Sequence, residues 1–328
     1  MNNYMEKLYK RGIHDENLLN SLKNEEDKEG VLYPLIELVR KSKDLVLQIR
    51  DNYFNIYYRG GNVAEVESLN RVKFDKNYFR KCENKTDEDW NAIKSNSDTA
   101  KELFKAGKFA EYVDFVTENM EFYWDNVLKG RGVEEKKTQH AICLSNTDKD
   151  EYTILDLEYQ VSTRSKFHYN ENGIRSKDDF TPTPRFDIIA IRNCDHKLCV
   201  IELKKGVKAL SDPSGVQEHA ESFANTIGYN KETKQTFVDE MNNVLKQKRD
   251  DLYLLDKRIT IDTSLEPEFM YAYQFDSTDK SHPTFESQKK VFKHYQDKKY
   301  IDGVNYAYNK RILWLNEGDY TLKGKGEL

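Results

Sequence analysis

Residues 184–206 read Pro-Arg-Phe-Asp-Ile-Ile-Ala-Ile-Arg-Asn-Cys-Asp-His-Lys-Leu-Cys-Val-Ile-Glu-Leu-Lys-Lys-Gly, and they decide which fold this chain adopts. Two runs of strand length, Phe186–Ile191 and Leu198–Leu203, are rich in β-branched residues and flank the short polar break Asn193–Lys197. This pattern is typical of a β-hairpin. Both faces of both runs are apolar, which is typical of strands in a sheet that is covered on both sides. We therefore predict an α/β (α+β) core with a mixed central sheet flanked by helices.

Three polar residues interrupt the apolar hairpin at its open end, namely Asp187, Glu202 and Lys204. Side chains alternate along a strand, so Glu202 and Lys204 share a face while Leu203 points away. With a turn centred on the Asp195–His196 bond, Asp187 lies directly across from Lys204 and diagonal to Glu202. We predict two carboxylates and an ammonium within reach on one face, whereas a one-residue change of register would separate them.

This trio suits the hydrolysis of a phosphodiester. Two neighbouring carboxylates bind a hard divalent cation such as Mg²⁺ or Mn²⁺ through oxygen. The cation lowers the pKa of a bound water and neutralises charge on the phosphate under attack. A lysine beside it orients that water or stabilises the developing negative charge. The structural alternative is a plain salt bridge between Lys204 and Glu202 at a solvated strand end.

An Asp at the start of one strand and a Glu-x-Lys at the end of the next resembles the PD-(D/E)xK nuclease superfamily. The matching positions are Asp187, Glu202, Leu203 and Lys204, although the proline, Pro184, lies three positions before the Asp instead of next to it. The resemblance implies a restriction-endonuclease-like core in which Asp187 and Glu202 hold Mg²⁺ or Mn²⁺. It also implies that the Leu203 carbonyl adds a ligand and that Lys204 acts on the water. The resemblance covers residues 184–206 and says nothing of the rest of the chain.

Further site residues follow from the same resemblance. Some branches of the superfamily use a Gln on the helix after the Glu-x-Lys strand, which implies an accessory role for Gln217. Many members add an upstream acid, for which Glu134, Glu135 and Glu158 are open alternatives. Read without the resemblance, His219 on the same helix is compatible with a general base, but a surface position is favoured.

The composition bounds the function classes. With 328 residues, the chain is long enough for one large or two modest domains. It is 33% charged and 12% aromatic, with a mean hydropathy of -0.87, which is polar but too aromatic for disorder. A net charge of -5 lacks the basic balance of many nucleic-acid-binding proteins. A phosphate-binding surface must therefore be local, and Lys205 and Lys208 are candidates for it.

The cysteines and the hydropathy pattern bear on the compartment. The four cysteines show no disulfide-framework spacing. Cys194 and Cys199 bracket His196 at the hairpin turn, but a zinc knuckle needs two more ligands from elsewhere. There is no signal-peptide pattern and no apolar run of membrane-spanning length. We expect a reduced, cytoplasmic protein that contacts no membrane, with a homodimer and a protein partner of the N-terminal region left open.

Three regions are predicted along the chain. Residues 1–85 form helices plus a three-stranded meander, residues 86–130 a helical connector, and residues 131–328 the nuclease core. Aromatic residues on the strand at 53–59 are compatible with base stacking, but a role in a core is favoured. The predicted strands lie at 45–50, 53–59, 62–67, 139–145, 152–161, 268–275 and 310–316, and the predicted helices lie at 16–22, 31–42, 86–130, from 216, 232–249 and 285–298.

Together these observations predict a Mg²⁺- or Mn²⁺-dependent nuclease, with DNA favoured over RNA as its substrate. A role in defence or repair is an expectation by analogy alone. The alternative is a catalytically inactive nuclease-like module that binds nucleic acid or a protein partner without metal-dependent turnover.

Overall fold

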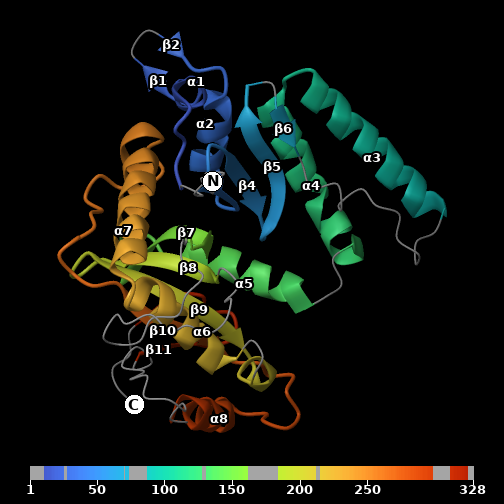
Figure 1. Cartoon of the computed structure of the whole chain (residues 1–328). Coiled ribbons are helices and arrows are strands. Elements are labelled where there is room, and N and C mark those ends of the chain that lie inside the picture. Colours follow the sequence, from blue (N-terminus) through green and yellow to red (C-terminus); the bar gives the residue numbers. More distant parts are fainter. Residues whose placement is uncertain are drawn as a thin grey trace, which may run out of the picture. The chain divides into compact units, whose positions relative to one another are not determined.

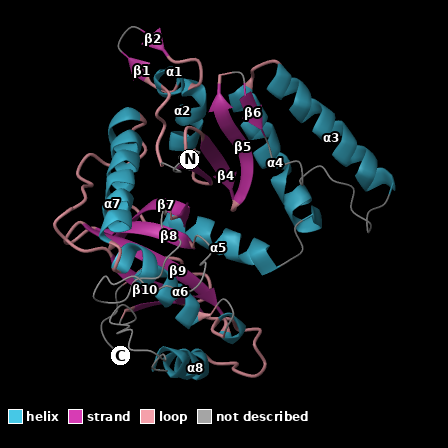
Figure 2. Cartoon of the chain, in the orientation of Figure 1, coloured by secondary structure: helices cyan, strands magenta, loops and turns pink. Residues whose placement is uncertain are grey.

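The computed structural model describes residues 11–25, 28–69, 71–73, 87–127, 131–161, 184–211, 215–297 and 311–323. The chain divides into two compact units. The N-terminal unit contains residues 11–144 and 247–254, and the C-terminal unit contains residues 145–246 and 255–328. The protein is α+β: the N-terminal unit holds a four-stranded antiparallel sheet and the C-terminal unit a mixed five-stranded sheet with helices (Figure 1 and Figure 2).

The sheet of the N-terminal unit confirms the predicted meander and extends it. Its strands are β3 (Leu45–Ile49), β4 (Phe54–Tyr58), β5 (Gly61–Ser68) and the added β6 (Arg71–Lys73). The turn before β5 needs glycine, because Gly60 has a φ of +83° and a Cβ there would lie 2.4 Å from the Lys136 carbonyl oxygen. Phe54 and Ile56 are fully buried, in agreement with the predicted core role of that strand.

The other regular elements in the described part of the N-terminal unit are helices and the short hairpin β1 (Asn24–Glu25) and β2 (Lys28–Glu29). The predicted strand at 139–145 is wrong, because these residues form the last turns of a helix. A short apolar run does not distinguish a strand from a helix, and the charged helix formers that precede it continue the helical pattern. The helices are α1 (Glu16–Ser21), α2 (Tyr33–Lys41), α3 (Asp87–Lys105), α4 (Phe109–Val127) and α5 (Arg131–Ser145).

The C-terminal unit is built on a mixed sheet with the order β11-β10-β9-β8-β7. Its first three strands are antiparallel: β7 (Tyr152–Gln160), β8 (Arg185–Arg192) and β9 (Lys197–Lys205). The next two, β10 (Glu268–Gln274) and β11 (Ile312–Leu315), run parallel to β9. The predicted hairpin is thus confirmed as β8 and β9, and it lies in the interior of the sheet, as its two apolar faces require.

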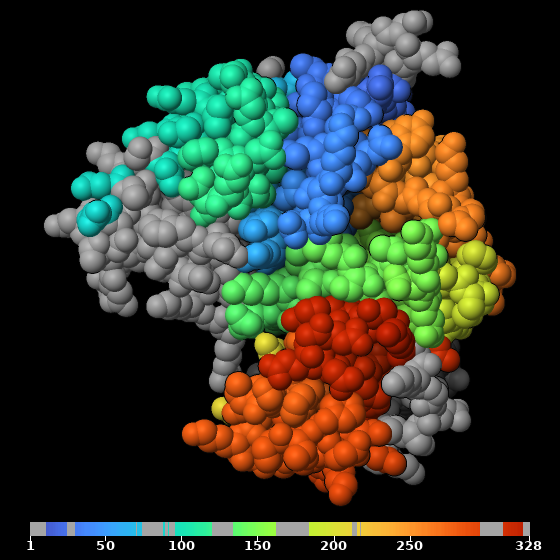
Figure 3. Space-filling model, turned by 180° about the vertical axis from the view of Figure 1, so that it is seen from behind, coloured from blue at the N-terminus to red at the C-terminus, as the bar shows by residue number. Residues whose placement is uncertain are grey.

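Aromatic residues of β10 mark the sheet face that α6 (Val216–Phe223) and α8 (Phe285–Asp297) cover. Phe223 of α6 stacks on Phe269 with 5.0 Å between ring centroids. Phe292 of α8 lies 5.6 Å from the ring of Tyr271. The π-helical turn Ala224–Gly228 joins α6 to α7 (Lys231–Lys246). Figure 3 shows the molecule from behind. The red segment that contains β11 lies against the orange surface of the segment that precedes it in the C-terminal unit.

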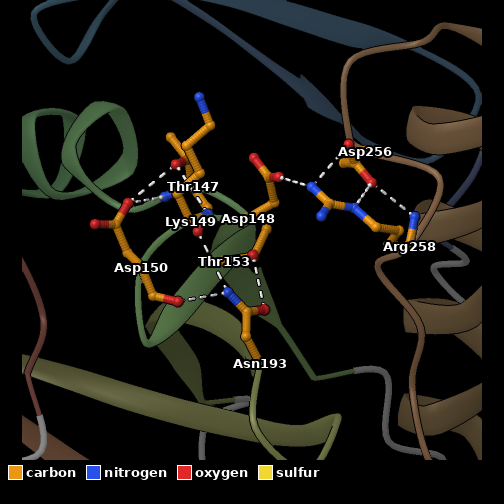
Figure 4. A network of polar contacts seen from close by, with 8 residues as sticks. All are labelled: Thr147, Asp148, Lys149, Asp150, Thr153, Asn193, Asp256 and Arg258. Atoms are coloured by element: carbon orange, nitrogen blue, oxygen red, sulfur yellow. Dashed lines mark hydrogen bonds and ion pairs between the residues drawn. The ribbon is translucent and has the colours of Figure 1, made fainter.

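Polar contacts fix the turn between β8 and β9. The Arg192 guanidinium donates to both oxygens of Asp195 at 2.9 and 2.7 Å and to Glu268 at 2.7 Å. Asn193 donates to the carbonyl oxygen of Asp150 at 2.8 Å and accepts from the Thr153 hydroxyl at 2.9 Å (Figure 4). Arg192 pairs with Lys197 across the hairpin, so the turn is centred between Cys194 and Asp195, one residue earlier than predicted.

Candidate functional site

The register of the hairpin brings Asp187 level with Glu202. The last backbone pair at the open end joins Ile188 to Ile201, so the next position sets Asp187 opposite Glu202. The prediction that Asp187 lies across from Lys204 is wrong, because the turn is centred one residue earlier and this changes the register by two residues. A two-residue change preserves the faces of a strand, so all three polar residues still share a face by register.

Asp187 is fastened to the strand that carries the other two residues. It is 9% exposed, and its Oδ2 accepts a hydrogen bond from the backbone N–H of Leu203 at 2.8 Å. Backbone pairing between the two strands has ended two residues earlier, at Ile201. The carboxylate therefore takes the place of a strand carbonyl and holds the peptide group that joins Glu202 to Leu203.

Glu202 and Lys204 form a buried ion pair. They are 3% and 5% exposed, and Nζ of Lys204 lies 3.1 Å from Oε1 of Glu202. Their register partners on β10 are Tyr271 and Tyr273, so the pair lies on the face that α6 and α8 cover. Burial raises the pKa of Glu202, but the positive charge of Lys204 and a hydrogen bond from His219 outweigh it and hold this pKa below its ordinary value. The carboxyl group is therefore ionised at neutral pH.

The two oxygens of Glu202 have different surroundings. Oε1 accepts from both Lys204 and His219, at 3.1 and 3.0 Å. Oε2 is buried, and no residue in the described part of the chain makes a hydrogen bond to it. An ionised oxygen without a partner is costly in a protein interior. A ligand that contacts Oε2 therefore stabilises this site more than one that contacts Oε1.

His219 belongs to the site, although the sequence favoured a surface position for it. Its Nδ1 lies 3.0 Å from Oε1 of Glu202, and its side chain is 22% exposed. The buried residues Val216, Ala220 and Phe223 define the inner stripe of α6, and His219 precedes Ala220 at the edge of that stripe. The signal that sequence reasoning missed is the helical spacing of His219, three residues after Val216 and four before Phe223, which indicates an inward position.

The accessory candidates differ in what the structure places. Gln217 lies in the first turn of α6, and the structure describes its backbone only. Glu158 stands level with Asp187 in the β7–β8 register, but it has a φ of +54° and pairs with Arg185 at 3.0 Å. Glu134 and Glu135 are exposed on α5 of the N-terminal unit.

Two lysines follow the site along the chain. Lys205 ends β9 half-buried, and Lys208 is exposed in the 3-10 turn Val207–Ala209. The hydrogen bond from Thr278 is the main cause that lowers the pKa of Asp276, and the charges of Lys205 and Lys208 lower it further. Both lysines thus lie near a carboxylate, and their contact with substrate phosphates stays a prediction.

The donor atoms of the site fit a hard cation rather than zinc. Within the described ranges, no three His, Cys, Asp or Glu side chains gather into a metal-binding group, at the Cys194–Cys199 turn or elsewhere. Mg²⁺ and Mn²⁺ do not require such a cage, because Mg²⁺ typically uses one or two carboxylates together with water and substrate phosphates. Asp187 and the unpartnered Oε2 of Glu202 provide such oxygens. The residues present therefore fit Mg²⁺ or Mn²⁺.

None of the helices in the described ranges has the length and apolar character needed to cross a bilayer. A search for similar proteins found no matching family model, no matching curated protein and no matching solved structure.

Proposed function

We propose that the protein is a Mg²⁺- or Mn²⁺-dependent nuclease that hydrolyses nucleic-acid phosphodiester bonds, with DNA as the favoured substrate. One observation carries the proposal: Asp187 and Glu202 lie level on adjacent buried strands, and Glu202 keeps one ionised oxygen without a partner in the described part of the chain. Lys204 and His219 already occupy Oε1 of Glu202, so Oε2 is the buried anionic oxygen that still needs a partner, and a cation suits it.

The order of the site residues along two adjacent strands supports the same proposal. Asp187 on one strand and Glu202-Leu203-Lys204 on the next match the PD-(D/E)xK pattern, and both strands lie inside a mixed sheet. We therefore assign the C-terminal unit to the restriction-endonuclease-like folds as part of this proposal. The role in defence or repair remains a hypothesis by analogy.

Each residue has a defined part in the reaction. Asp187, Glu202 and the Leu203 carbonyl would hold the cation, which when bound would supply a water of lowered pKa and neutralise charge on the phosphate. Lys204, fixed 3.1 Å from Glu202, orients the attacking water and stabilises negative charge on the phosphate oxygens. The oxygen of the water bonds to phosphorus, the bond from phosphorus to the leaving oxygen breaks, and the proton that the water loses ends on that leaving oxygen. Gln217 is assigned an accessory role in placing the phosphate.

A cleavage assay tests the proposal. Linear duplex DNA, single-stranded DNA and RNA are incubated with the protein and Mg²⁺, Mn²⁺ or EDTA. Cleavage is expected only with metal, and Asp187→Asn and Lys204→Met are each expected to slow it about 10²- to 10³-fold. Lys197→Met is the matched control, because Lys197 lies on the same strand at the hairpin end. Undiminished metal-dependent cleavage by Asp187→Asn would exclude this site.

The same assay distinguishes the proposal from a module that only binds. Nucleic-acid binding that EDTA leaves unchanged, together with no turnover in any metal, favours the catalytically inactive alternative. Titration with Mn²⁺ then separates the nuclease from the binding-only module. The nuclease is expected to bind Mn²⁺ in a way that depends on Asp187, whereas a binding-only module does not need such a metal site.

A further inference from the structure

The helix α6, which follows the site along the chain, is held against the sheet by a hydrogen bond from the strand next to Glu202. Its first residue, Val216, accepts a hydrogen bond through its carbonyl oxygen from the buried hydroxyl of Tyr271. Tyr271 is the register partner of Glu202 on the neighbouring strand. The strand next to Glu202 therefore holds the N-terminal turn of α6 in place, and His219 belongs to that turn.

This anchoring places a second donor on the carboxylate of Glu202. His219 donates through Nδ1 to the same oxygen that accepts from Lys204. Two donors from different elements, a strand and a helix, leave the carboxylate little freedom to rotate. The rotation they prevent is the one that would exchange the crowded Oε1 with the unpartnered Oε2.

We propose that His219 is a positioning residue that fixes Glu202 so that Oε2 faces the divalent cation. Mg²⁺ demands near-ideal octahedral geometry, so a ligand that is already oriented binds it more tightly than one that must be ordered first. Groups that orient a metal ligand in this way contribute about 10- to 100-fold in metal affinity. The inference rests on the proposed function only in taking Glu202 as a metal ligand.

Direct titration with Mn²⁺ in the absence of nucleic acid tests the inference. His219→Ala is expected to weaken Mn²⁺ binding about 10- to 100-fold. His219→Asn is expected to restore most of the affinity, because its side-chain amide nitrogen occupies nearly the position of the histidine Nδ1. Glu218→Ala, at the exposed neighbouring position on the same helix, is the control that leaves affinity unchanged.

The outcomes separate this inference from the proposed function. If wild-type protein binds Mn²⁺, Asp187→Ala abolishes binding and His219→Ala binds normally, the inference is overturned and the metal site stands. If wild-type protein and Asp187→Ala bind Mn²⁺ alike, or neither binds it, both are overturned. Thermal unfolding of each variant is measured in parallel, since a merely structural histidine alters stability without the affinity rescue by Asn. If His219→Ala does not fold, His219→Gln takes its place as the variant expected to weaken Mn²⁺ binding. The side-chain amide of Gln lies one atom further from the backbone than the histidine Nδ1.

Discussion

Substitution of Lys204 by methionine tests whether the buried charges serve structure or function. Lys204 and Glu202 lie 3.1 Å apart, and both side chains are almost completely buried. Removing one partner of such a pair leaves an uncompensated buried charge, which costs about 3–5 kcal/mol of the free energy of unfolding. Lys204→Met alone is therefore expected to be strongly destabilising. Methionine keeps an unbranched side chain, so little of this loss reflects packing.

The double variant Glu202→Met/Lys204→Met carries the decisive measurement. Replacing both partners of a buried ion pair by apolar residues of similar volume is often neutral, or stabilising by about 1–4 kcal/mol. We expect the double variant to be at least as stable as the wild-type protein while it loses Mn²⁺ binding. The assay is urea-induced unfolding of the full chain, followed by circular dichroism, for wild type, both single variants and the double variant.

A double variant that is as unstable as the single variants would refute this reasoning. The pair would then contribute net stability as an ion pair, and the salt-bridge interpretation of Glu202 and Lys204 would explain its presence. A gain in stability would instead mean that the protein retains buried charges at a cost, which is a property of functional sites.

Three further predictions concern the surroundings of the site and the N-terminal unit. Burial is the main cause that lowers the pKa of His140 to about 4, so stability is fully present above pH 6.5 and falls by up to about 3 kcal/mol as the pH drops from 6.5 to 4. His140→Gln should flatten this dependence in urea unfolding at several pH values, and equal slopes would contradict the cause. Gly206→Ala is expected to cost more than Gly107→Ala, because Gly206 has φ +66° with ψ 170°, a region that essentially only glycine adopts, and a Cβ there would lie 3.1 Å from Asp276, whereas a Cβ on Gly107 meets open space. Thermal unfolding compares the two, and equal losses would exclude crowding. Asn193→Ala removes the turn contacts of Figure 4 and should cost about 1–3 kcal/mol in thermal unfolding with Mn²⁺ affinity unchanged; a stability equal to wild type would show that these contacts do not hold the turn.

Local pattern was sufficient for most elements of the fold. Alternating and β-branched residues predicted β3, β4, β5, β7, β8, β9 and β10, and apolar periodicity predicted α2, α6 and α8, within a few residues. The short strands β1, β2 and β6 were not predicted, and α5 was predicted in part as a strand, because its apolar residues Ile142 and Leu144 fit either period. Three of the four buried residues of α5 in this segment are polar, namely Thr138, Gln139 and His140 beside Ile142, and only the packed structure reveals their burial.

The candidate site was predictable in its membership more than in its geometry. Asp187, Glu202 and Lys204 were identified because carboxylates and a lysine are unusual within apolar strands, and this is a property of the sequence alone. Their register was not predicted correctly, because the sequence pattern left the centre of the turn open by one residue, and contacts with distant residues, such as that of Arg192 with Glu268, are not visible in it.

The sequence by itself determined that two adjacent, doubly apolar strands carry these charges at one end, since strand period and β-branching act within a few residues. Only the tertiary structure decided which residue faces which, that α6 brings His219 onto Glu202, and that one carboxylate oxygen of Glu202 lacks a partner within the described residues. These features arise from contacts between distant segments, and a hydrogen bond between a helix and a strand leaves no local mark in either one.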